Sequence, residues 1–177
     1  MGYAPACAMI TAMTLTDRLK GVLRLDPVAY EDIERDSQAN TQALMIVVVA
    51  SVASGLGAGL SLGLGGLVRE SVGAVAGWVM WAGVTYVLGT RVWPESDTRT
   101  DMGELLRVIG FSYAPNFFSI FGVLPLVGNV VRGLVALWLL ATTVIAVRQA
   151  LDYRSTARAF QVVFVGWLIF VVIDWAT

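Results

Sequence analysis

The stretch ALMIVVVASVASGLGAGLSLGLG, residues 43–65, decides the fold class, because it is apolar or small along its whole length and carries no charge. A helix needs about 20 such residues to span the hydrocarbon core of a bilayer. Further stretches of this kind occupy residues 72–90, 104–122, 127–149 and 157–176. The sequence therefore predicts an all-α, polytopic transmembrane helical bundle of about five membrane helices.

The composition of the 177-residue chain supports lipid as its solvent. The chain is 57% hydrophobic and 14% charged, whereas soluble domains are about 45–50% apolar and about 25% charged. Its 12 basic and 13 acidic residues give a net charge of −1, which excludes the basic excess that nucleic-acid binding needs.

Residue chemistry argues against an enzyme. The chain has no histidine and one cysteine, Cys7, so sites that need an imidazole and most zinc sites are excluded. It also lacks a P-loop, a nucleophile elbow and an HExxH motif. We expect no catalytic residue, no cofactor and no metal ion.

The chain before the first span divides into two parts. Residues 1–13 show no pattern and are expected to form a flexible extension, with Met13 as an alternative start. Residues 14–42 are expected to form cytoplasmic helices, the first amphipathic over 14–25 and the second beginning at Asp26-Pro27. The first helix places Leu15, Leu19, Val22 and Leu23 on one side and Asp17, Arg18, Lys20 and Arg24 on the other. It lies flat in the membrane interface or packs on the ends of the bundle, and the sequence leaves both alternatives open.

Positive charge predicts the orientation. With the N-terminus in the cytoplasm, ten of the 12 Lys and Arg residues lie inside, and only Arg69 and Arg132 lie outside. This distribution follows the positive-inside rule. It predicts a cytoplasmic N-terminus, an outside C-terminus and outer connections, at about 66–71 and 123–126, that are little more than turns.

Small residues recur every four positions on the first span. Ser51, Gly55, Gly59 and Gly63 form this row, and a second row contains Gly57, Ser61 and Gly65. Rows of this kind allow helix backbones to approach closely in lipid. They predict a helix-packing interface, either within this chain or with a partner in a homo- or hetero-oligomer.

Polar residues inside the spans are the other candidates. Arg132 and Asp174 are expected near the outer ends of spans four and five, where an ion pair is one interpretation. Pro115 and Asn116 interrupt the third span, where a proline frees a backbone carbonyl and kinks the helix. A kink satisfied by neighbouring helices, a small polar cavity and a re-entrant segment are the alternatives there.

The order of several segments resembles the bacterial branch of the Yip-one domain family over about residues 25–175. The most specific segments are ELLRVIGFSYAPNFF, the LPLVG turn and AVRQALDYRSTARAFQVV. The resemblance implies a membrane domain over 43–177 with five helices and a cytoplasmic N-terminus. Eukaryotic members act as adaptors that bind prenylated GTPases and coat proteins, but their DLYGP-type signature is missing here. GTPase binding therefore rests on family analogy alone.

These features predict a non-enzymatic integral membrane scaffold or accessory subunit in a bacterial cytoplasmic membrane. Its expected partners are membrane lipids and other membrane proteins, and its charged cytoplasmic face comprises residues 14–36, 93–101 and 152–158. A small oligomeric transporter or channel is one alternative, and a lipid-binding or membrane-shaping protein is another.

Overall fold

The computed structural model describes residues 13–58, 63–96 and 98–176, except for the side chains of residue 64 and residues 173–176. All the regular elements in these ranges are helical, so the protein is an all-helical bundle, as predicted. The elements are α1 (Leu15–Leu23), α2 (Pro27–Arg35), α3 (Ala39–Gly57), α4 (Gly63–Val87), η1 (Leu88–Val92), α5 (Met102–Ser112), η2 (Ala114–Val123), α6 (Gly128–Ala150) and α7 (Thr156–Ala176).

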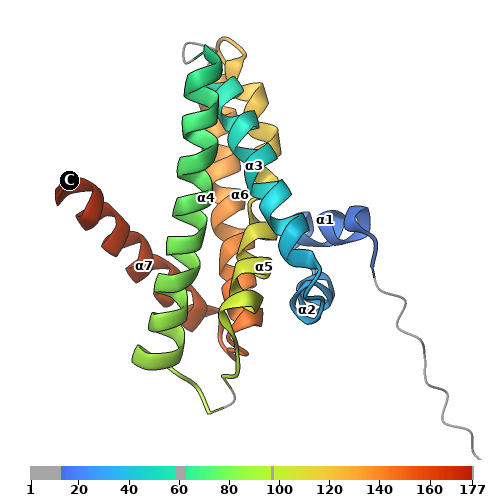
Figure 1. The fold of residues 1–177 in the computed structure, drawn as a ribbon, viewed down its shortest axis with the longest axis vertical. Coiled ribbons are helices and arrows are strands. Elements are labelled where there is room, and N and C mark those ends of the chain that lie inside the picture. The colour runs from blue at the N-terminus through green and yellow to red at the C-terminus, as the bar shows by residue number, and fades with distance from the viewer. Residues whose placement is uncertain (1–12, 59–62, 97, 177) are drawn as a thin grey trace, which may run out of the picture.

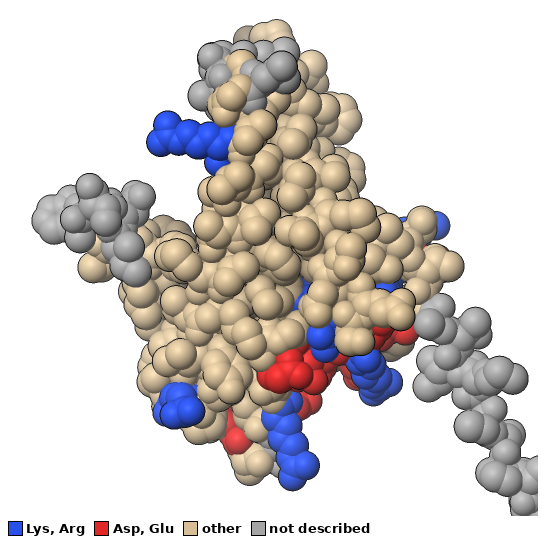
Figure 2. Space-filling model, viewed as in Figure 1, with Lys and Arg blue, Asp and Glu red and all other residues tan. Residues whose placement is uncertain are grey.

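The helices run between two ends that differ in charge. Helices α3, α4 and α6 lie along the long axis, α1 and α2 lie beside the lower half of the bundle, and α7 leans away from the other helices (Figure 1). Figure 2 shows that nearly all the charged side chains visible in this view gather at the end that carries α1 and α2. We call this the charged end, and the opposite end, where α3 and η2 finish, the apolar end.

Three helices are long and apolar enough to cross a membrane by length and composition. They cover Ala39–Gly57, Gly65–Val92 and Gly128–Ala150, and the apolar helix Thr156–Val172 is shorter. Large apolar side chains are exposed along these helices, among them Leu137 at 66% and Val72 at 65%. An apolar surface of this extent requires lipid or a partner around it, and the protein is an integral membrane protein.

Helices α1 and α2 form a hairpin that packs on the bundle. Thr14 accepts a hydrogen bond from the Asp17 amide, and Asp26 caps α2 in front of Pro27. Val22 is fully buried, and the Trp138 indole on α6 donates to the Leu23 carbonyl over 3.1 Å. The structure therefore has α1 packed on the bundle, and its placement flat in the membrane interface stays a prediction.

The third apolar stretch is a broken helix. Helix α5 ends at Ser112, and the chain continues as the 3-10 helix η2, with the Asn116 amide donating to the Tyr113 carbonyl over 2.9 Å. Pro115 has no amide hydrogen, so the α-helical bonding pattern cannot continue through it. The 11 residues of α5 and 10 of η2 would extend about 36 Å end to end, at rises of about 1.5 and 2.0 Å.

The first predicted outer connection differs from the structure. Residues 66–71 lie within α4, which begins at Gly63 with a φ of +60°. Nothing in GLVRES interrupts helical bonding, and Arg and Glu are good helix formers. Arg69 and Glu70 therefore stand on a membrane helix, well inside its first end, instead of on a turn.

Candidate functional site

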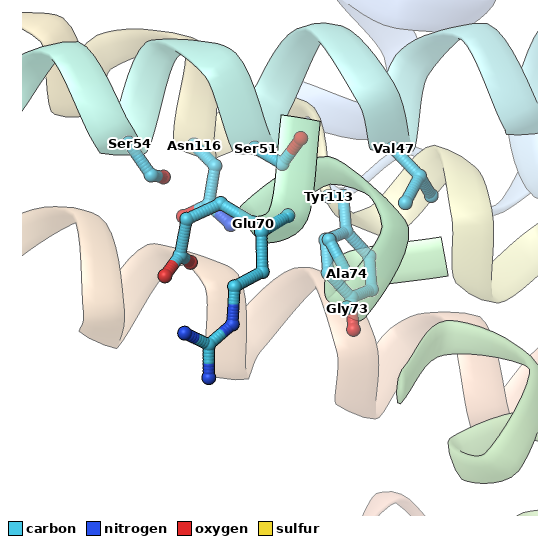
Figure 3. A pocket seen from close by; sticks show the side chains of 9 residues that line it. Val47, Ser51, Ser54, Glu70, Gly73, Ala74, Tyr113 and Asn116 are labelled. Carbon is cyan, nitrogen blue, oxygen red and sulfur yellow. The ribbon is translucent and has the colours of Figure 1, made fainter. Parts of the chain in front are cut away.

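A polar cavity of about 480 Å³ lies where the third span breaks. It opens between α3, α4 and the junction of α5 with η2, so three segments that are distant in sequence contribute to it. Figure 3 shows the polar ends of Ser54, Asn116 and Glu70 around one opening. The lining residues are Val47, Ser51, Ser54, Arg69, Glu70, Gly73, Ala74, Tyr113 and Asn116.

The helix break brings two polar side chains to this cavity. Pro115 is buried in the first turn of η2, and Tyr113 and Asn116 line the cavity on either side of it. Neither Tyr113 nor Asn116 forms a side-chain hydrogen bond with any residue that the structure describes. Their hydrogen-bonding groups are therefore available to a ligand or to water.

Helix α3 supplies the hydroxyl groups of the cavity. The Ser51 hydroxyl lies 2.7 Å from the Val48 carbonyl, to which it donates, and 3.1 Å from the Ser71 hydroxyl of α4. Ser54 lies one turn further along the same face of α3. Ser51 therefore joins α3 to α4, whereas Ser54 contributes a polar group to the cavity wall.

Two adjacent charges lie at the mouth of the cavity. Arg69 and Glu70 are exposed on α4, and neither has an ion pair or side-chain hydrogen bond within the described ranges. Glu70 is seven residues from the start of α4, which corresponds to about 10 Å along the helix. A charge in lipid at this depth costs free energy unless it has a polar partner.

The predicted row of small residues has mixed surroundings. Ser51 bonds to α4, and a Cβ at Gly55 would lie 3.0 Å from Leu67 Cδ2, so this part of the row faces α4. Gly59 lies outside the described residues, and Gly63 starts α4. The closest approach is in the second row, because a Cβ at Gly57 would overlap the Ser119 carbonyl of η2.

Arg132 binds helix ends within this chain. Its guanidinium donates to the carbonyls of Gly57 and Gly122, over 3.2 and 3.1 Å, and to Asn129 Oδ1 over 2.8 Å. A cation beside these carbonyls compensates the partial negative charge at the C-terminal end of a helix. The side chain of Asp174 lies outside the described residues, so the proposed Arg132–Asp174 pair stays a prediction.

At the charged end, Arg18 joins α1 to α2 and α3. Its side chain is 2% exposed and forms ion pairs with Asp32 at 2.7 Å and Asp36 at 2.8 Å. It also donates to Gln42 Oε1 over 3.0 Å. Burial lowers the pKa of Arg18, but hydrogen bonds and charge from the two carboxylates have the larger effect, so its pKa is raised overall. The hydrogen bond from Arg18 in turn lowers the pKa of Asp36.

The buried position of Arg18 differs from the sequence prediction, which placed it on the polar side of the helix. Arg18, Gly21 and Val22 are the buried residues of α1, and their i, i+3, i+4 spacing places Arg18 on the same face as Val22. The face of α1 that packs is therefore partly ionic. Five exposed charged residues of the hairpin form what we call the charged platform: Asp17 and Lys20 on α1, Arg24 at its C-cap, and Glu31 and Arg35 on α2.

Glu34 on α2 lines a polar pocket of about 340 Å³. Burial raises the pKa of Glu34 to about 7, assisted by the negative charges of Asp152 and Glu104. The backbone carbonyl of Glu34 accepts from Arg107 Nη2 over 2.6 Å, and Arg107 Nε is buried without a partner among the described residues. The pocket is lined by Glu31, Glu34, Arg35, Arg148, Gln149, Asp152, Tyr153 and Arg154.

Comparison with known proteins identifies the family. The family model for the Yip1 domain matches residues 20–176. The chain belongs to the Yip1 domain family. A search of curated proteins and a search of solved structures each returned no match.

Family membership agrees with the resemblance drawn from the sequence, and with a helical membrane protein. The match covers the polar cavity and all of the charged platform except Asp17, since it begins at Lys20 in α1 and ends at Ala176, the last residue of α7. Among the described residues, no group of three or more Cys, Asp or Glu side chains is arranged to hold a metal ion. The chemistry that these sites offer is hydrogen bonding and charge pairing.

Proposed function

We propose that this Yip1 domain protein is a non-enzymatic membrane scaffold or accessory subunit that binds a partner through its charged platform. The observation that carries the proposal is the Arg18 ion-pair network. It fixes α1 and α2 to the bundle through two carboxylates and Gln42. A surface held in place in this way loses little conformational freedom when a partner binds.

The charge on the platform suits a protein partner or a membrane-associated one. It carries both signs, with the Arg35–Glu31 pair at 3.2 Å exposed on α2. Mixed exposed charges favour selective and steered association over strong binding to one polyanion. The absence of histidine from the sequence and the lack of a catalytic motif support a role in assembly rather than catalysis.

The proposal includes a location and an orientation. We place the protein in a bacterial cytoplasmic membrane with five crossings, the charged end inside and the C-terminus outside. Three long apolar helices, the broken α5–η2 segment and α7 supply five stretches. The arginine distribution supports this orientation, because positively charged segments are retained in the cytoplasm.

Site-specific photo-crosslinking in the native cells tests the proposal. A photoreactive residue at Lys20 or Arg35, both exposed on the platform, should yield a discrete adduct larger than the chain itself. The same residue at Leu137, which is 66% exposed on α6, is the control for contacts on the membrane-facing surface and should not give that adduct. In an Arg18→Met background the platform adduct should weaken, since the hairpin is no longer fixed.

Two results together would contradict the scaffold proposal. If neither platform position gives an adduct, and mild detergent extraction yields a monodisperse monomer, the protein is not a scaffold that acts through this face.

A further inference from the structure

A second hollow lies next to the polar cavity, and its lining has the opposite character. It is a groove of about 580 Å³ between α4, α6 and α7, where α7 leans away from the bundle. Tyr113 lines both the groove and the polar cavity. The remaining groove residues are Trp81, Ala136, Leu139, Leu140, Thr143, Phe160, Val163, Phe164 and Trp167.

One face of α4 runs from the cavity to the groove. Glu70 and Ala74 line the cavity, and Trp81 lines the groove. These positions and Gly77 are spaced three or four residues apart, which places them on the same helix face. A Cβ at Gly77 would meet no atom within 4 Å, and the same holds at Gly73. The surface of α4 between the two hollows is therefore unobstructed at these two glycines.

Polarity changes along this path as it does along a lipid molecule. Arg69 and Glu70 lie nearer the apolar end, followed by the polar cavity with Asn116, while the aromatic groove lies deeper. Glu70 and Trp81 are separated by about 16 Å along α4, at a rise of about 1.5 Å per residue. A head group at the first site would therefore direct its acyl chain into the groove.

The two charges at the mouth indicate which head group fits. Arg69 can pair with a phosphate and the adjacent Glu70 with an ammonium, and neither is satisfied within the described part of the chain. A site with one positive and one negative group matches a zwitterion better than an anion. The hydrogen-bonding groups of Asn116 and Tyr113 add acceptors and donors beside them.

We propose that the cavity and groove together bind one phospholipid with a zwitterionic, amine-bearing head group, of the phosphatidylethanolamine type. The phosphate lies at Arg69, the ammonium at Glu70, and one acyl chain passes Gly77 into the groove between α4, α6 and α7. This site is separate from the charged platform, so it adds a lipid ligand to the proposed scaffold role.

Native mass spectrometry of the full-length protein in mild detergent tests the site. The probes are phosphatidylethanolamine and phosphatidylglycerol with identical acyl chains. The wild-type protein should retain one phosphatidylethanolamine in preference to phosphatidylglycerol. Glu70→Gln should reduce this preference by about tenfold, the effect of losing one charge-assisted hydrogen bond. This exposed substitution leaves helix packing intact.

Two leucine variants on α4 test the path. Gly77→Leu fills the open space and should reduce phosphatidylethanolamine retention by about tenfold or more. Ala76→Leu is the matched control, because it lies one residue away but lines a different hollow, between α3 and α4. It should retain the lipid as the wild type does.

A photoreactive acyl chain locates the bound lipid. Phosphatidylethanolamine with a diazirine in its chain should label peptides of α6 and α7 that contain Leu140 and Phe164. Equal retention of the two lipids, retention by Gly77→Leu equal to that by Ala76→Leu, or labelling spread evenly over all helices would each overturn the proposal.

Discussion

Replacing Arg18 with methionine should release α1 from the bundle. Methionine keeps most of the apolar stem but removes the guanidinium, which leaves Asp32 and Asp36 without their partner. Removing one member of a buried ion pair costs about 3–5 kcal/mol. Asp32 is 14% exposed and Asp36 33% exposed, so water can solvate part of the remaining charge, and we expect about 2–4 kcal/mol of local stability to be lost.

Hydrogen exchange of the α1 peptide measures this loss directly. Exchange of protected amides reports the free energy of local opening. With about 1.4 kcal/mol for each factor of ten, exchange in α1 should become about 30- to 1,000-fold faster. Amides of α6 distant from the hairpin should exchange as in the wild type, because the groups that Arg18 binds, on Asp32, Asp36 and Gln42, lie outside α6.

Arg35→Met is the matched control for this experiment. Arg35 also pairs with a carboxylate, Glu31 at 3.2 Å, but the two side chains are 70% and 48% exposed. An exposed pair of this spacing contributes about 0.3–0.5 kcal/mol, so exchange should change by about twofold. Equal exchange rates for α1 in the Arg18 and Arg35 variants would refute the role assigned to Arg18.

Three further predictions concern pH, helix ends and close packing. The raised pKa of Glu34, about 7, disfavours the ionised form in the folded protein. Stability should therefore fall as pH rises from about 4.5 to about 7. Thermal unfolding of Glu34→Gln should lack this pH dependence, whereas Glu31→Gln should keep it. Arg132→Met should lower the free energy of unfolding by about 1–2 kcal/mol, measured in detergent, because two helix-end carbonyls lose their donor; unchanged unfolding would contradict that assignment. Gly57→Ala should destabilise the protein by about 1–3 kcal/mol through backbone overlap, whereas Gly73→Ala, where the space is open, should not; equal effects of the two would show that α3 and η2 are not packed as described.

The sequence predicted the helical membrane fold because the signal is long and local. Five apolar stretches, a proline in the third and a capped pair of helices before the first can each be recognised within about 20 residues. The Yip1 domain match over residues 20–176 agrees with this prediction of the family. Helix boundaries were less predictable, since α4 begins at Gly63 and contains the residues expected to form a turn.

Contacts between distant residues could not be predicted in the same way. Arg18 and Gln42 are 24 residues apart, and Arg132 and Gly57 are 75 apart. Both arginines bind groups that only tertiary packing brings near them. Arg18 did leave a local signal, because it is one helical turn from Val22, which puts the two on the same face of α1.

The polar cavity could be predicted in part from the sequence. Pro115 and Asn116 marked the break, and a kink or small cavity was one interpretation of them. The contribution of α4 could not be foreseen, because Arg69 and Glu70 were assigned to an outer turn. That Tyr113 lines both hollows depends on how α7 leans from the bundle, which no local pattern encodes.

Thiol accessibility at the two ends of the chain tests the central claim, an odd number of crossings with the charged end inside. Cys7 is the only native cysteine, and a Cys7→Ser, Thr177→Cys variant moves the single thiol to the other end. A membrane-impermeant maleimide should label Cys7 only in inverted vesicles, and the new thiol at position 177 only in intact cells. Labelling of both thiols from the same side would require an even number of crossings and would contradict the account.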